Sequence, residues 1–231
     1  MTTIKKLFTT LVCTTLLGAF ASVASAAEPV MGPKLFKQFE FGMPLDAVTQ
    51  VDSSIKPCSE LFPADGFPSN AYCKYPQKFL DHDWLCVYVF EEPIGLMAVR
   101  LISTEDYSTE LFTDLSNKLS DYVPLSLTIG SETTIMLDKP IEEVLTIYAE
   151  KRLKLFQTDE LFMLELFPKK DFVAAQALAK RSENPLQGFA QYLAKNRTLK
   201  MYRNPADGTF GLFFEADALY AAFKQLQREE F

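Results

Sequence analysis

The residues with the most chemical potential surround His82, the single histidine of this 231-residue chain, which stands between Asp81 and Asp83. An imidazole beside two carboxylates has the donor types of a metal site. Neighbouring residues of an extended chain point in alternate directions, so these three side chains do not converge on one ion. A Ser-His-Asp or Cys-His relay would need the same histidine, and no Gly-x-Ser-x-Gly elbow accompanies it. We expect His82 in a solvated loop and assign no catalytic residue and no metal ligand.

Other catalytic patterns are equally sparse. The chain contains neither Gly-x-Gly-x-x-Gly nor the phosphate loop Gly-x-x-x-x-Gly-Lys-Ser/Thr, so we expect no nucleotide and no other cofactor. Adjacent carboxylates such as Glu91-Glu92 are typical of solvated turns and helices. A glycosidase pair that only the tertiary structure assembles is invisible in a sequence. A secreted hydrolase that uses two carboxylates therefore stays as an alternative.

The N-terminus has the pattern of a signal peptide. Two lysines precede an apolar core at 7–21, and the small residues at 24–26 match what a signal peptidase reads. We predict a leader at 1–26, cleavage after Ala26, and a periplasmic or secreted protein. A transmembrane anchor is the alternative, but the core is shorter and richer in threonine than a span of about 20 residues. We expect no membrane span in the mature chain.

Composition describes an acidic globular protein. The chain has 23 basic and 30 acidic residues, and loss of the leader with its two lysines makes it more acidic still. Such a surface repels the phosphates of nucleic acids and anionic lipids, so neither is an expected partner. The 20 phenylalanines indicate a packed core, because aromatic side chains bury large areas.

Three cysteines remain after the predicted cleavage. Cys58 and Cys73 flank a stretch rich in Pro, Gly, Ser and Asn, and an oxidising compartment favours a disulfide between them. Closing a loop of about 15 residues is worth on the order of 3 kcal/mol in the entropic description. Cys86 lies in an apolar run and is expected to be a buried thiol. Pairing of Cys86 with either of the others, or no disulfide at all, are the alternatives.

The alternation of short apolar runs and helical periods predicts an α+β fold, in which antiparallel β-hairpins form a sheet and helices pack against it. Hairpins are expected at 84–103, 153–167 and 199–215, and one or two strands at 123–137. A short strand is expected at 37–41 and a long irregular stretch at 52–83. Helices are expected at 44–51, 106–122, 140–152 with Asp138 as cap, 171–181 with Asp171 as cap, 185–196, and from Asp217 onward. The helix at 140–152 should bury Ile141, Val144, Leu145 and Tyr148.

The same rhythm indicates an internal repeat of a hairpin followed by a helix. The three candidate units are 84–122, 153–181 and 199–229, and their unequal spacing is also what an ordinary α+β domain produces. We divide the mature chain into an N-terminal unit at 27–122, with the disulfide loop, and a C-terminal unit at 123–231.

One stretch resembles a known family. Phe41-Gly42-Met43-Pro44 with Val48, followed by the hairpin at 84–102, is similar to the repeat of beta-lactamase-inhibitor-like proteins and small outer-membrane assembly lipoproteins. The resemblance covers 39–102, under a third of the mature chain. It implies a sheet face that binds other proteins, without catalysis. The Cys58–Cys73 insertion and the missing lipid-anchor cysteine depart from the lipoprotein pattern, so no functional residue is transferred.

These observations favour an exported, noncatalytic protein that binds another envelope or secreted protein, or a ligand. Lys200 and Arg203 belong to a basic stretch that would suit an acidic partner, or that simply protects a hairpin edge. Among hairpin aromatics expected in the core, Trp84 stands at a strand start and is kept as a candidate contact residue. A hydrolase, and a structural envelope component that self-associates, are the alternative functions. The oligomeric state is not predicted.

Overall fold

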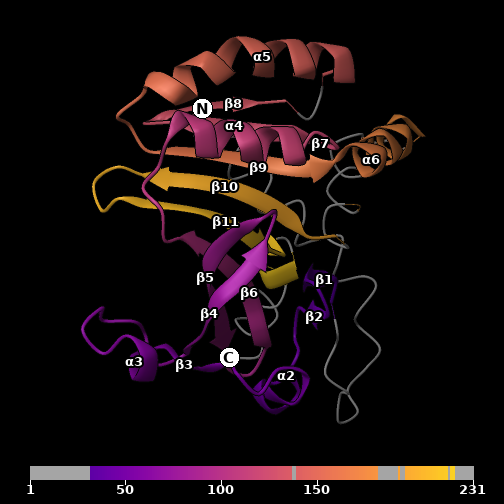
Figure 1. The fold of residues 1–231 in the computed structure, drawn as a ribbon. Coiled ribbons are helices and arrows are strands. Elements are labelled where there is room, and N and C mark those ends of the chain that lie inside the picture. Colours follow the sequence, from indigo (N-terminus) through magenta and orange to yellow (C-terminus); the bar gives the residue numbers. More distant parts are fainter. Residues whose placement is uncertain (1–31, 137–138, 182–191, 193–195, 218, 222–231) are drawn as a thin grey trace.

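The fold is organised around one antiparallel sheet with the strand order β3-β4-β5-β6-β11-β10-β9-β7-β8. Figure 1 shows this sheet in a computed structural model that describes residues 32–136, 139–181, 192, 196–217 and 219–221. The helices pack alongside the strands, so the predicted α+β class is confirmed.

The N-terminal unit contributes four strands to the sheet and a separate two-stranded ribbon. The ribbon pairs β1 with β2, and β3 to β6 form one end of the sheet. Their bounds are β1 (Lys34–Phe36), β2 (Phe39–Glu40), β3 (Lys56–Pro57), β4 (Ala71–Phe79), β5 (His82–Glu91) and β6 (Gly95–Ser103). The hairpin predicted at 84–103 is confirmed as β5 and β6.

The C-terminal unit contributes the other five strands, and both units share the sheet because β6 pairs with β11. Their bounds are β7 (Tyr122–Ile129), β8 (Glu132–Ile135), β9 (Phe162–Pro168), β10 (Thr198–Asn204) and β11 (Thr209–Glu215). The hairpin of β10 and β11 is confirmed. Its turn is held by the Asp207 carboxylate, which accepts from the Thr209 N–H at 2.9 Å, and by Gly208 at a φ of 72°.

The described helices are short except for the two in the C-terminal half. Their bounds are α2 (Leu45–Val51), α3 (Cys58–Leu61), α4 (Thr109–Lys118), α5 (Ile141–Gln157) and α6 (Lys169–Arg181). Ser108 caps α4, since its Oγ accepts from the Leu111 N–H at 3.1 Å. The helix predicted at 106–122 is shorter than expected because the chain extends again from Tyr122 into β7.

One face of the sheet, the front face, carries the main core. Phe162 of β9 packs edge-to-face on Phe112 of α4 with ring centroids 5.8 Å apart, and α4 crosses in front of β7 and β9 in Figure 1. Phe214 of β11 packs on Phe36 of the β1–β2 ribbon at 5.1 Å. The front face is thus covered by α4 at one end and by the ribbon nearer the middle.

Two predicted elements are wrong. The stretch 52–83 is not irregular, because it contains β3, α3, β4 and the start of β5. Pro76 hid β4: it lies where the register with β5 shifts between Lys74 and Gln77, a place where a missing N–H is tolerated. The hairpin at 153–167 does not form either. Residues 153–156 continue α5, and β9 pairs with β7 and β10 instead.

The loss of that hairpin removes the middle unit of the expected repeat. α6 also begins before its predicted cap, so Asp171 stands in its first turn. Leu145 was expected in the buried face of α5 but is 39% exposed, whereas Val144 is buried. The leader at 1–26, Asp138 and most of the helices predicted at 185–196 and after Asp217 lie outside the described residues.

Candidate binding site on the sheet

The back face of the sheet, opposite the front face, gathers polar and aromatic side chains over its central strands. Strand register places Arg100 of β6 opposite Phe213 of β11, Phe213 opposite Lys200 of β10, and Lys200 opposite Glu165 of β9. Directly opposed residues share a face. The neighbouring residue of each strand points to the front face instead. These four neighbours are all buried: Val99, Phe214, Leu199 and Leu166.

Ion pairs connect the charged members of this row to the end of β11. Lys200 Nζ lies 2.8 Å from Glu215 Oε2 and also binds Asp217, and Arg100 Nη2 lies 3.2 Å from Glu215 Oε1. Burial would raise the pKa of Glu215, but the charges of Lys200 and Arg100 hold it below its usual value. Burial would lower the pKa of Lys200, and the carboxylates of Glu215 and Asp217 raise it instead. Glu215 and Lys200 are therefore both charged at neutral pH.

Glu165 has a different environment from Glu215. Ser126 of β7 donates to its carboxylate at 3.0 Å, and no ion pair within 4.0 Å joins Glu165 to a cation among the described residues. Burial raises the pKa of Glu165, and the nearby charge of Lys200 and the Ser126 hydrogen bond only partly oppose it. Glu165 thus holds a proton more readily than an exposed glutamate.

An aromatic patch of Arg100, Tyr202 and Phe213 lies beside these charges. The Tyr202 and Phe213 rings stack with centroids 5.2 Å apart, and the Arg100 guanidinium lies 5.1 Å from the Phe213 centroid. Gly211 makes this close packing fit, since a Cβ there would lie 2.5 Å from the Leu101 carbonyl oxygen and 3.1 Å from the Phe213 ring. All three side chains are half-buried, so part of each faces solvent.

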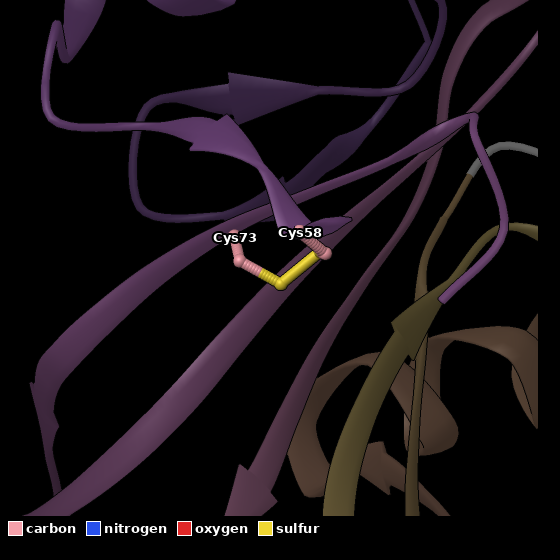
Figure 2. Close-up of a disulfide and its surroundings, with 2 residues drawn as sticks. All are labelled: Cys58 and Cys73. Atoms are coloured by element: carbon pink, nitrogen blue, oxygen red, sulfur yellow. A yellow bond between two sulfur atoms is a disulfide. The ribbon is translucent and has the colours of Figure 1, made fainter. Parts of the chain in front are cut away.

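The disulfide closes the back face next to this patch. Figure 2 shows Cys58, where β3 passes into α3, bonded to Cys73 of β4. Cys73 stands opposite Val87 of β5, and Val87 stands opposite Arg100. The closed segment buries a second, smaller core of Cys58, Ala71, Cys73 and Val87, against which Phe62 and Phe67 pack. The predicted pairing is confirmed.

Cys86 is the free cysteine of the described chain, and it is buried as expected. Burial raises the pKa of its thiol to about 12. The thiol therefore stays protonated and is a poor nucleophile at neutral pH.

The three contact residues chosen from the sequence have different positions. Lys200 belongs to the charged row on the back face. Arg203 lies on the front face, where it donates to the Thr158 carbonyl and its guanidinium is 4.1 Å from the Tyr107 ring centroid. Trp84 is 1% exposed, and its indole N–H donates to the Phe79 carbonyl at 2.9 Å. Trp84 is therefore buried, and Arg203, like Lys200, is paired within the chain, so the contact role of these residues stays a prediction.

His82 begins β5 and does not lie in a solvated loop, so that expectation is wrong. Its Nε2 is 2.8 Å from Asp114 Oδ2 of α4, and Lys118 lies 2.7 Å from the same carboxylate. The hydrogen bond from Lys118, followed by that from His82, lowers the pKa of Asp114. Within the described ranges, no three His, Cys, Asp or Glu side chains converge to hold a metal ion. His82 therefore fastens the β4–β5 turn to α4.

Sequence reasoning missed most of the back-face residues. Arg100 is the one charge of β6 and Glu165 is the one charge of β9, whereas β10 carries two charges, Lys200 and Arg203. A charge at an alternate position of each of three strands is the signal that could have found a shared polar face. Which strands are neighbours was not readable, so the row itself was not predicted.

No known protein family matches this sequence, and neither does any curated protein or solved structure with which it was compared. The resemblance of 39–102 to beta-lactamase-inhibitor-like proteins accordingly stays a prediction. None of the described helices combines the length and the apolar character that a transmembrane helix requires.

Proposed function

We propose that this chain is an exported, noncatalytic protein that binds another envelope or secreted protein through the back face of its sheet. The aromatic patch of Arg100, Tyr202 and Phe213 is the observation that carries the proposal. Aromatic residues and arginine are the types most enriched among residues that dominate binding energy at protein interfaces. Here they stand together, half-buried, over the central strands of a sheet.

Export rests on two separate observations. The leader pattern at 1–26 ends in small residues suited to a signal peptidase. The disulfide between Cys58 and Cys73 is of the kind that persists in oxidising compartments such as the periplasm. Mass determination of the mature chain tests the leader directly, and we expect Ala27 at its N-terminus.

Site-directed photo-crosslinking in intact cells tests the binding face. A photoreactive residue at Tyr202 is expected to form an adduct with one defined envelope protein. The same residue at Val173, which is 49% exposed on α6, is the matched control and should not. Equal adducts at both positions, or none at Tyr202 under any condition, would contradict the proposal.

A substitution then measures the contribution of the patch. Phe213→Ala should weaken binding of the captured partner by about tenfold or more, as expected of a central aromatic contact. Val173→Ala should leave the affinity unchanged. Thermal melts of both variants separate a loss of contact from a loss of folding.

A secreted hydrolase is the second candidate, and the raised pKa of Glu165 is what favours it. A buried carboxyl that holds its proton resembles the general acid of a glycosidase. Its potential carboxylate partner, Glu215, is bound by both Lys200 and Arg100, which leaves it poorly placed to act as base or nucleophile. We therefore rank binding first.

Hydrolysis of a panel of aryl glycosides by the purified protein tests this candidate. Activity that is abolished by Glu165→Gln, and kept by Glu142→Gln on the exposed side of α5, would establish the hydrolase and displace the binding role.

A further inference from the structure

The sheet ends on β8, and no described strand pairs with the outer side of β8. β8 pairs with β7 alone among the described strands, and it is the last strand in the sheet order. Ile135 is 46% exposed and Glu132 is also exposed, so the strand is accessible from outside. Its sequence, Glu-Thr-Thr-Ile, contains neither proline nor lysine, the residues that commonly protect an open edge.

The hydrogen-bonding direction along β8 follows from one contact. The Met136 N–H donates to the Leu125 carbonyl, just beyond the end of β8. Backbone groups of alternate residues in a strand point to the same side, so Glu132 and Thr134 direct theirs toward β7. Thr133 and Ile135 direct theirs outward. Within the described residues, neither of these two makes a backbone hydrogen bond outside the sheet.

α5 does not satisfy this edge. The helix lies above β8 in Figure 1, but it packs against β7. Backbone groups inside a helix are bonded within it, so α5 offers no partner for a strand.

The outer edge of β8 can form antiparallel hydrogen bonds with the same edge of a second copy of this chain. Two copies related by a two-fold axis perpendicular to the sheet pair in antiparallel fashion with their faces preserved. If the axis passes at Thr134, then Thr134 stands opposite its own copy and Thr133 stands opposite Ile135 of the other chain. The outward groups of Thr133 and Ile135 then form four hydrogen bonds. The two Glu132 carboxylates lie at opposite ends of the pair, where they do not repel.

We propose that β8 is a dimerisation edge at which a second copy of this chain adds antiparallel, giving one sheet continuous through both copies. The second copy is the occupant that matches in length, in hydrogen-bonding side and in charge placement. Side chains also fit, since threonine beside isoleucine is a favourable cross-strand pair and the exposed Ile135 gains cover. This proposal does not depend on the proposed function, which concerns a different part of the sheet.

Sedimentation equilibrium of the mature protein, from about 5 to about 500 µM, tests the proposal. A four-residue strand pair buries less area than a standard stable interface, so we expect a weak dimer whose fraction rises across this range. A weight-average mass that stays monomeric up to the highest concentration would overturn the inference.

Charge substitutions at the two-fold axis test the register. Thr134→Lys and Thr134→Glu each place like charges directly opposite each other, so each variant alone should remain monomeric. An equimolar mixture of the two variants should dimerise at least tenfold more tightly than either alone. A dimer of either variant as tight as the unmodified protein, or no gain on mixing, would place the interface elsewhere and refute the register.

A backbone substitution provides the control for folding. Thr133→Pro removes an outward N–H and leaves the backbone ladder to β7 intact, and proline is accepted at such an edge. The variant also loses the side-chain hydrogen bond between Thr133 and Thr128 of β7 at 3.0 Å, which Thr133→Val removes without removing the N–H. We expect both variants to keep the far-UV spectrum of the unmodified protein and to share one melting temperature at low concentration, with loss of the dimer in Thr133→Pro alone. Retention of the dimer by a folded Thr133→Pro protein would also refute the proposal.

Discussion

The back face of the sheet has two parts, one over β4 and β5 and the other over β6, β11, β10 and β9. The two parts differ in the side chains that they carry and in whether the chain covers them. Over β4 and β5 the face is apolar, and the chain covers it with its own disulfide-closed segment around Cys73 and Val87. Over β6, β11, β10 and β9 the same rows carry Arg100, Lys200 and Glu165 beside stacked aromatic rings. The first part is a finished core, and the second part has the mixture of rings and charges found at protein interfaces.

This difference in side chains explains why one part of the back face is covered by the chain while the other part stays partly exposed. Apolar residues are stable only when covered, so the part near β4 needs the segment that Cys58 holds in place. The part near β10 satisfies its charges internally through Lys200 and Glu215, so it tolerates partial exposure without a cover. Such a surface can stay partly exposed without uncovering an apolar core.

The largest loss of stability is expected from a substitution that removes Lys200 from the charged row. Lys200→Met leaves Asp217 without its cation and leaves Glu215 with Arg100 alone, and it removes the positive charge that lowers the pKa of Glu165. Removing one partner of a buried ion pair costs about 4 kcal/mol, which urea unfolding at pH 7 should detect. Lys78→Met is the control, because that side chain is 72% exposed and its pair with Asp83 contributes little. Equal losses in the two variants would mean that the charged row does not stabilise the sheet.

The sealed part is tested by removing its disulfide. Replacing Cys58 and Cys73 together by alanine opens a loop with a sequence separation of 15 and should cost about 3 kcal/mol. Hydrogen exchange should rise first in β4 and around Val87, while β10 and β11 stay protected. Faster local exchange in β10 and β11 as well would show that the two parts are not independent.

The smallest effect on stability is expected from Glu165→Gln. Unlike the two preceding substitutions, this one should stabilise the protein. Because the folded-state pKa of Glu165 is raised, its contribution to stability is complete below the unfolded pKa and is lost as pH rises through the folded pKa. Glu165→Gln keeps an acceptor for Ser126 and removes this loss. The variant should match the natural protein near pH 4 and become the more stable of the two as pH rises, which melting temperatures across that range will measure.

A constant difference between the two proteins across that range would mean that Glu165 titrates normally. Glu142→Gln, on an exposed position of α5, should give no pH-dependent difference and controls for net charge.

Sequence patterns of a few residues were sufficient to predict turns and helix starts, because these depend on the backbone preferences of neighbouring residues. The turn around Asp207 and Gly208 and the helix entry at Pro44 were readable because their residues have specific backbone preferences. The division between α5 and β9 was not readable, since 153–156 is equally apolar as strand or helix and only continuation of the helix from Ile141 decides it. β4 was missed because Pro76 is acceptable only where the register with β5 shifts.

The sequence alone predicted the α+β class and the excess of acidic residues, and it favoured the Cys58–Cys73 pairing and a buried Cys86 over the alternatives, because composition and short-range spacing control them. The tertiary structure alone decided that Trp84 and Arg203 belong to the front face, and that Arg100, Phe213, Lys200 and Glu165 form one row. Strand neighbours far apart in the chain create that row, and a shift of one residue in any register would move its side chains to the other face.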